Sequence, residues 1–285
     1  MIHHLPLEVR TVHGYFSREL RPVLTVRPGD TVHFQSLNSD WRWDPTEELF
    51  ERDKRVHDGH ALNGPIEVRG ALPGQTLVVR IDDVQPRDWG VTFGNGTAFG
   101  WSIRDGEALD ERGKRVALAP FLGVIGMPPP ERGIHSTIPP RRWGGNIDCK
   151  DLVAGTTLYL PVPVEGALLS VGDGHAAQGH GEVSGTAIES PLEHGQVTID
   201  VRDDLELRSP IARTADAWLA FGFNSDLDLA AEQATEAMLD LMERELGVDR
   251  AHALALSSVV VDLHVTQLVN RAKGVHAVLR DRAIR

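Results

Sequence analysis

Residues 23–34 read VLTVRPGDTVHF, and this stretch sets the expected fold. Two short apolar runs rich in β-branched residues flank Pro28-Gly29, and β-branched residues favour strands whereas Pro and Gly favour turns. The same order recurs around Pro73-Gly74, and the runs at 158–162 and 197–201 extend the pattern. Many short strands separated by Gly and Pro are typical of a β-sandwich or barrel.

The sequence changes character after residue 210. Residues 226–246 carry apolar side chains at helical spacing, with Ser225 or Asp226 placed to cap the start and Gly247 to end the helix. Asp249 is placed to cap a short second helix. The run from Val259 onward, with Val261, Leu263 and Val265, alternates as a strand that would place these four side chains on one face.

We therefore expect a mainly β fold, with a β-sandwich or barrel-like core and a C-terminal α+β portion. Residues 1–205 would form the β-rich part, and residues 206–285 would pack tightly against it because no linker-like stretch separates them. Residues 38–64 and 86–140 lack clear periodicity. Loops of that length are usually functional, or they contain elements that the pattern does not reveal.

Composition narrows the partners and the compartment. The formal net charge of −12 disfavours nucleic acid and anionic membranes, and no apolar run approaches the roughly 20 residues of a membrane helix. The single cysteine excludes an intrachain disulfide and fits a reducing compartment. The first residues lack the pattern of a signal peptide. We therefore expect an intracellular protein, with neither nucleic acid nor a membrane as its partner.

Residues 172–182 read GDGHAAQGHGE and concentrate two histidines and two carboxylates. A dinucleotide fingerprint needs a helix directly afterwards, and the glycines at 179 and 181 argue against one. Imidazole and carboxylate together suit a zinc-like ion. A glycine-rich hairpin with solvated polar side chains is the plain structural alternative. This segment follows the apolar run 167–171, which is expected to be a buried strand, and it is interpreted as a polar loop.

Two further glycine-flanked loops, DGHALNGP at 58–65 and GGNIDCK at 144–150, add metal-capable side chains. His60, Asp148 and His175 would make a three-ligand catalytic site with one position left for water. A covalent alternative has Cys149 attack the substrate with Lys150 and a glutamate, Glu165 or Glu182, assisting. A lone intracellular cysteine is more often a small buried hydrophobe.

Several segments resemble the acetamidase/formamidase family and together run from about residue 58 to 270. They are DGHALNGPIEVRGALPGQTLVVRI, PFLGVIGMPP, GGNIDCKDLVAGTTLYLPVPVEGALLSVGDGHAAQGHGEVSGTAIE, FGFNSDLDLAAEQATEAMLDLM and DLHVTQLVN. The resemblance implies a hydrolase that cleaves linear amides such as formamide or acetamide to a carboxylate and ammonia. It also implies a β-sandwich or barrel, a cytosolic homo-oligomer (dimer or higher), and metal-bound forms.

The resemblance places His60, Asp148, Asp173, His175 and Glu182 in the site region. As a hypothesis, His60, Asp148 and His175 hold a divalent metal, with zinc expected, and Glu182 moves the proton between water and the leaving nitrogen. Asp173 would orient a ligand imidazole or join the ligands.

Three further residues, His180, Asn63 and Asn146, are candidates for an extra ligand or for the pocket wall. His180 departs from the family pattern, since many relatives carry Asp there. A non-catalytic β-sandwich module that binds a metal or a small ligand remains the alternative from a different class.

Overall fold

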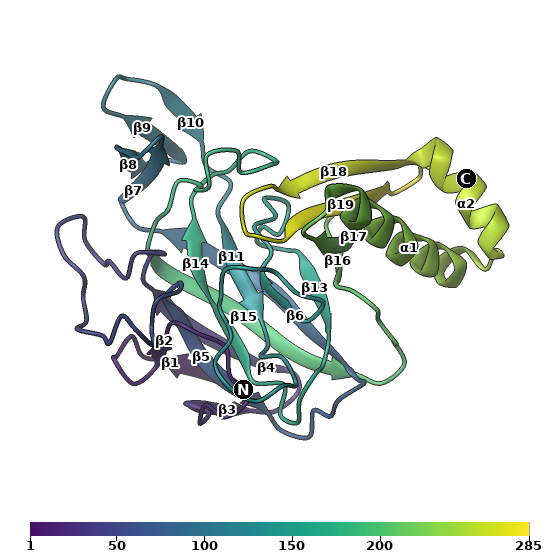
Figure 1. The fold of residues 1–285 in the computed structure, drawn as a ribbon, viewed down its shortest axis with the longest axis horizontal. Helices are drawn as coiled ribbons and strands as arrows, with labels where there is room; N and C mark the ends of the chain where they lie inside the picture. Colours follow the sequence, from purple (N-terminus) through teal and green to yellow (C-terminus); the bar gives the residue numbers. More distant parts are fainter. Residues whose placement is uncertain (285) are drawn as a thin grey trace.

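The computed structural model describes residues 1–284, and within them two β-sheets stack into a sandwich (Figure 1). The nine-stranded sheet has the order β1 (Ile2–Leu5), β4 (Asp30–Ser36), β15 (Leu192–Arg202), β6 (Thr76–Pro86), β13 (Thr157–Pro161), β16 (Ile211–Arg213), β17 (Ala217–Asn224), β19 (Lys273–Arg280), β18 (Val261–Gln267). The second sheet has the order β12 (Gly144–Asn146), β11 (Phe121–Gly126), β14 (Leu169–His175), β5 (Leu62–Val68), β2 (Val12–His13), with β3 (Leu24–Val26) also beside β5. The expected mainly β fold is confirmed.

The chain crosses between the two sheets at Pro28-Gly29. Strand β3 pairs with β5 in one sheet, whereas β4 pairs with β1 and β15 in the other. Gly29 has a φ of 84°, which glycine adopts without the steric cost of a Cβ atom. The turn thus directs the chain from one layer to the other.

The main hydrophobic core lies between these layers. Inward-facing side chains alternate along most of the strands, as the period-2 pattern requires, although β11 departs from it. From the nine-stranded sheet they include Val32, Phe34, Leu77, Val79, Ile81, Leu158, Val197 and Ile199, and from the facing sheet Ile66, Val68, Leu122, Ile125, Leu169 and Val171.

The strands of the C-terminal portion belong to the nine-stranded sheet and do not form a sheet of their own. Strand β16 pairs with β13 and with β17, so hydrogen bonding continues from the sandwich into β17, β19 and β18. Helix α1 (Leu227–Leu246) packs on β17 and β19. The division of the chain at residue 205 stays a prediction.

The helix boundaries follow the capping signals. Asp226 accepts from two backbone N–H groups at the start of α1, and Gly247 ends it with a φ of 66°. Asp249 caps α2 (Arg250–Val260) as expected. The alternation expected from Val259 is wrong at its start, because Val259 lies in α2 and is exposed, and strand β18 begins at Val261.

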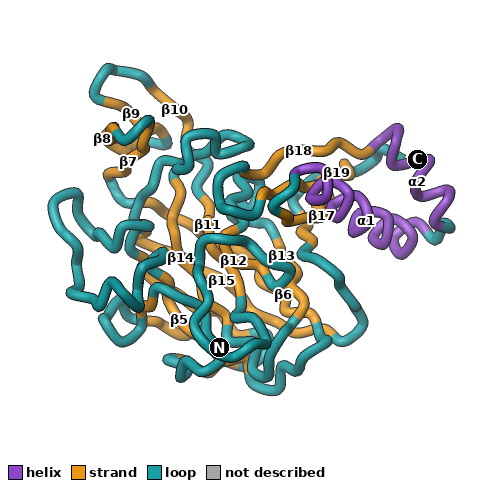
Figure 2. The backbone as a smooth tube through the Cα atoms, viewed as in Figure 1, coloured by secondary structure: helices purple, strands orange, loops and turns teal. Residues whose placement is uncertain are grey.

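The two long aperiodic segments differ from each other. Residues 86–140 contain a four-stranded sheet, β7 (Trp89–Gly94), β8 (Thr97–Arg104), β9 (Glu107–Asp110) and β10 (Arg115–Ala117), besides β11. Residues 38–61 run as turns and loops along one side of the sandwich (Figure 2). Neither helix in the described part of the chain has the length and apolar character needed to cross a membrane.

His13 ties the N-terminal strand β2 to the sandwich interior. Its Nδ1 lies 2.7 Å from the Tyr15 carbonyl oxygen and its Nε2 lies 3.0 Å from Ser170 Oγ. Burial lowers the pKa of His13 to about 4, although the Tyr15 carbonyl opposes the shift. A neutral buried imidazole destabilises the fold in acid, since the unfolded chain takes up its proton at a higher pH.

We predict that His13→Gln makes unfolding less sensitive to acid. Between pH 6.5, the ordinary histidine pKa, and about 4, the folded pKa, the native histidine costs about 1.4 kcal/mol per pH unit, or about 3 kcal/mol in all. Urea unfolding across this window should show a shallower loss of stability for the variant. His252→Gln, at an exposed position of α2, is the control. Parallel curves for wild type and His13→Gln would contradict the account.

Candidate active site

Asp173 and His175 lie in strand β14. Because side chains alternate along a strand, the two residues lie on the same face of it. The expectation that residues 172–175 form a loop is therefore wrong. Gly172 and Gly174 face the opposite side, where a Cβ atom would come within 2.5 Å of a neighbouring carbonyl oxygen. The glycines thus serve close strand packing, while Asp173 itself has a positive φ of 60°.

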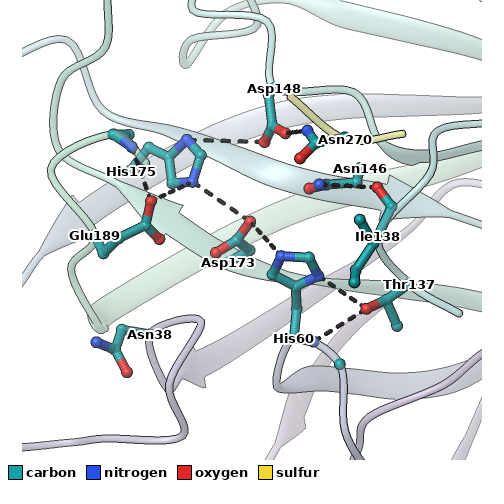
Figure 3. Close-up of polar contacts among 12 residues, drawn as sticks. Asn38, His60, Thr137, Ile138, Asn146, Asp148, Asp173, His175, Glu189 and Asn270 are labelled. Atoms are coloured by element: carbon teal, nitrogen blue, oxygen red, sulfur yellow. Dashed lines mark hydrogen bonds and ion pairs between the residues drawn. The ribbon is translucent and has the colours of Figure 1, made fainter. Parts of the chain in front are cut away.

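His175 is fully buried at the centre of a polar cluster (Figure 3). Its Nδ1 lies 2.9 Å from Gln178 Oε1 and 3.9 Å from Asp148 Oδ1. Its Nε2 lies 3.4 Å from both Asp173 Oδ2 and Glu189 Oε1. Burial alone would lower the pKa of His175, but the two carboxylates outweigh it and raise the pKa well above the usual value.

Gln178 fixes the hydrogen-bonding role of one ring nitrogen of His175. The Gln178 amide nitrogen donates to the Asp148 carbonyl oxygen at 2.8 Å, which turns Oε1 toward His175. Because Oε1 only accepts, Nδ1 of His175 must donate. The Nε2 atom faces Asp173 and Glu189, and it can bind a metal once it has given up its own proton.

The other carboxyls respond to burial in different ways. Burial, reinforced by repulsion from Glu182, raises the pKa of Asp148 well above its usual value. Burial also raises the pKa of Glu182 to about 7, although the charge of His175 opposes this. The pKa of Asp173 is lowered despite burial, because His175 and His60 stabilise its charge.

His60 joins the cluster through Asp173. Its Nε2 lies 4.0 Å from Asp173 Oδ2, and its Nδ1 lies 2.8 Å from Thr137 Oγ1, which also accepts from the His60 backbone N–H. Figure 3 shows the resulting series of contacts from Asp148 through His175 and Asp173 to His60. The three glycine-flanked loops singled out in the sequence thus come together in space.

The donor set fits a metal ion. His175 belongs to two groups of three side chains whose ligand atoms lie within 4.8 Å of one another. The first group is His175 with Asp148 and Glu182, and the second is His175 with Asp173 and Glu189. One buried oxygen of each of these four carboxyls has no hydrogen-bond partner among residues 1–284. Unpaired buried carboxylates are costly, and a divalent cation would satisfy them.

Several residues that complete the cluster were not predicted. Glu189 follows the buried Ala187 and Ile188, and nothing in that spacing signals a ligand. The Asn270 amide donates to Asp148 Oδ2, and Asn270 is the last residue of the DLHVTQLVN segment. Gln178 lies within the GDGHAAQGHGE segment itself, but its neutral amide side chain is not a typical metal ligand or proton-transferring group.

The remaining candidates fall outside the cluster or at its margin. The Cys149 thiol is fully buried in the hydrophobic core, and burial raises its pKa, so a reactive thiolate is disfavoured. His180 faces Asp151 instead, and burial lowers its pKa to about 4. Asn63 and Asn146 are buried, and their amide nitrogens donate to backbone carbonyl oxygens.

A pocket of about 530 Å³ borders the cluster at Glu182. Its wall combines Trp101 from β8 with Val116 and Ala117 from β10 and with Gln178 from the glycine-rich segment. Because Glu182 belongs both to this pocket and to the metal-capable group, it connects the buried cluster to a space open to small molecules.

Comparison with known proteins gives consistent matches. A model of the acetamidase/formamidase family matches residues 4–120 and 130–279. An acetamidase of Mycolicibacterium smegmatis is 52% identical over a match that spans 60% of this chain and 61% of that protein. A predicted acetamidase/formamidase of Thermoanaerobacter tengcongensis superposes with a TM-score of 0.88, at 27% identity over 99% of this chain and 96% of that one. An acetamidase of Bacillus halodurans does so with a TM-score of 0.85, at 30% identity over 98% and 97%.

We predict that Gly123→Ala disrupts the cluster. A Cβ atom at Gly123 in β11 would lie 2.6 Å from Asp173 Oδ2, 2.7 Å from Asp148 Oδ1 and 2.9 Å from His175 Cε1, so these side chains must shift. Elemental analysis should find that the variant retains less tightly bound divalent metal than wild type. Gly179→Ala is the matched control, because no described atom lies within 4 Å of its Cβ. Equal metal content in Gly123→Ala and wild type would refute the prediction.

Proposed function

Because the chain belongs to the acetamidase/formamidase family, we propose that its buried cluster hydrolyses short aliphatic amides, such as formamide or acetamide, with the help of a divalent metal. The family and its relatives support hydrolysis of an amide C–N bond to an acid and ammonia. The observation that carries the proposal is the set of buried, partly unpartnered carboxyls around His175, beside a pocket that Glu182 shares.

We assign the metal to the side of His175 that presents Nε2. Asp173 and Glu189 flank that nitrogen at equal distances of 3.4 Å, and His60 Nε2 lies 4.0 Å from Asp173 Oδ2. A zinc-like ion suits this mixture of imidazole and carboxylate. When bound, such an ion supplies a water with a pKa near 7 and polarises the amide carbonyl.

With the metal on that side, we assign Asp148 a role in proton transfer together with Glu182, and not the role of metal ligand expected from the sequence. Asp148 lies on the Nδ1 side of His175, which Gln178 already occupies, and it forms a metal-capable group with Glu182 instead. Its raised pKa favours the protonated form, which can donate a hydrogen bond to Glu182.

Glu182 is the residue suited to moving the proton. As a carboxylate it takes a proton from the attacking water, whose oxygen bonds to the carbonyl carbon. It then returns that proton to the nitrogen as the C–N bond breaks and ammonia leaves. A pKa of about 7 lets the same group accept and donate near neutral pH.

The pocket favours small substrates. Its apolar wall, from Trp101 to Ile188, suits a short alkyl group, while Glu182 offers a polar contact to the amide. We place this activity in a cytoplasmic homo-oligomer, a dimer or higher. The net charge of −12 disfavours nucleic-acid and membrane partners.

Metal removal should abolish turnover. We predict that ammonia release from formamide and acetamide falls to background after dialysis against a chelator and returns when zinc is added, because the carboxyl cluster alone cannot activate water at neutral pH. Full activity in a rigorously metal-free sample would disprove the metal mechanism. A protein that binds metal but releases no ammonia from any amide would instead be a binding module.

Glu182→Gln should lower kcat about 100- to 10,000-fold, since it removes the proton-transferring group while preserving shape. Cys149→Ala tests the covalent alternative in the same assay and should retain turnover, because the thiol is buried in the core. Glu165→Gln, at an exposed position, is the control for a neutralised glutamate. Loss of activity in Cys149→Ala together with retention in Glu182→Gln would reverse the assignment.

A further inference from the structure

A second group of metal-capable side chains lies outside the cluster around His175. It consists of Asp151, His180, His264 and His276, which we call the histidine cluster, and their ligand atoms all lie within 4.8 Å of one another. His264 and His276 face each other across β18 and β19, at paired positions of the hairpin. Asp151 and His180 come from the two loops that also carry Asp148 and Glu182.

The spacing of the histidine cluster matches tetrahedral coordination. Asp151 Oδ2 lies 3.4 Å from His276 Nε2 and 3.5 Å from His180 Nε2. The three imidazole centroids are 4.8, 5.1 and 5.2 Å apart. Bonds of about 2.0–2.1 Å in a tetrahedral zinc site put ligand atoms roughly 3.3 Å apart. Small side-chain movements would therefore bring all four ligands onto one ion.

His276 is oriented as a ligand should be. Its ring is fully buried, and its Nδ1 lies 2.8 Å from Thr266 Oγ1. Its Nε2 points at Asp151 and has no hydrogen-bond partner within the described part of the chain. A metal-ligating histidine commonly has its other ring nitrogen held by the protein in this way. The buried Nδ1 atoms of His180 and His264 also lack partners within residues 1–284.

The neighbouring charges leave room for a cation. Lys150 pairs with Asp151 Oδ1 at 3.2 Å, so Oδ2 stays directed at the histidines. Asp216 and Arg280, the other charged residues of the adjoining 420 Å³ cavity, pair with each other at 3.0 Å. Three imidazoles and one carboxylate select zinc-like transition metals over calcium or magnesium, which prefer oxygen ligands.

We propose that the histidine cluster is a second divalent metal site, which fastens the C-terminal hairpin to the loops of the active site. The hairpin already meets these loops through backbone bonds, from the Gly181 N–H to the Thr266 carbonyl oxygen and from the Leu268 N–H to the Gly181 carbonyl oxygen. Asn270, just beyond β18, donates a hydrogen bond to Asp148 Oδ2. An ion shared by Asp151, His180, His264 and His276 would cross-link the two sides. The proposal rests on this geometry and not on the amidase activity.

The test counts metal ions in the metal-stripped, full-length protein titrated with zinc by calorimetry. His264→Gln is the decisive variant, because His264 takes no part in the cluster around His175. It should bind one zinc ion fewer per chain than wild type, or bind that ion at least about 100-fold more weakly. Its zinc-induced rise in Tm should be smaller too. His252→Gln, on α2, should behave as wild type.

Cobalt provides an independent readout, since tetrahedral Co²⁺ absorbs visible light strongly. Wild type should gain this absorption and His264→Gln should lose the part due to the histidine cluster. If His264→Gln fails to fold, Asp151→Asn decides the matter by the same count. Equal zinc stoichiometry, affinity and Tm shift in wild type and the folded variant would overturn the proposal. A chain without metal at His175 would still show the one-ion difference, so the two proposals fail separately.

Discussion

Four carboxyl groups crowd around one imidazole in the interior of the sandwich, and the electrostatics of that contact governs the site. Burial would drive these groups to their neutral forms, and their mutual repulsion would add to that tendency. The charge of His175 keeps Asp173 ionised, while Asp148 and Glu182 are shifted toward protonation. One divalent ion would balance the excess negative charge. The arrangement of the four carboxyl groups therefore depends on metal binding.

The fold supplies what this crowding requires. Strand β14 presents Asp173 and His175 on one face, and glycines on the other face and at Gly123 leave space where side chains would collide. The neighbouring loops bring in Asp148 and Glu182 with positive φ values of 51° and 43°, a backbone conformation with a steric cost for both residues. Asn270, in the turn between β18 and β19, donates a hydrogen bond to Asp148 Oδ2. Rigid strands thus hold the side chains, and loops give access to them.

Sequence patterns predicted several sandwich strands, the helix caps and the gathering of His60, Asp148 and His175 at one place, because alternation, capping and glycine-flanked polar residues are local signals. They missed the strands within residues 86–140, whose sequence shows no clear period. They missed the strand character of residues 172–175, since glycines that pack strands resemble glycines that make turns. They also missed Glu189, whose role depends on burial against β14 rather than on its neighbours in sequence. His180 lies outside the cluster around His175. It contacts His264 and His276, which only the folded hairpin of β18 and β19 brings beside it.

Crystals of the zinc-loaded, catalytically active protein offer the most direct test of the central claim. An anomalous-difference map at the zinc edge should show an ion bound to His175 Nε2 and flanked by Asp173 and Glu189, with Nδ1 still directed at Gln178. Active crystals that show no ion in contact with His175 would contradict the account. An ion held on the Nδ1 side by Asp148 and Glu182 would do so as well, because Glu182 would then be a ligand and not free to move the proton.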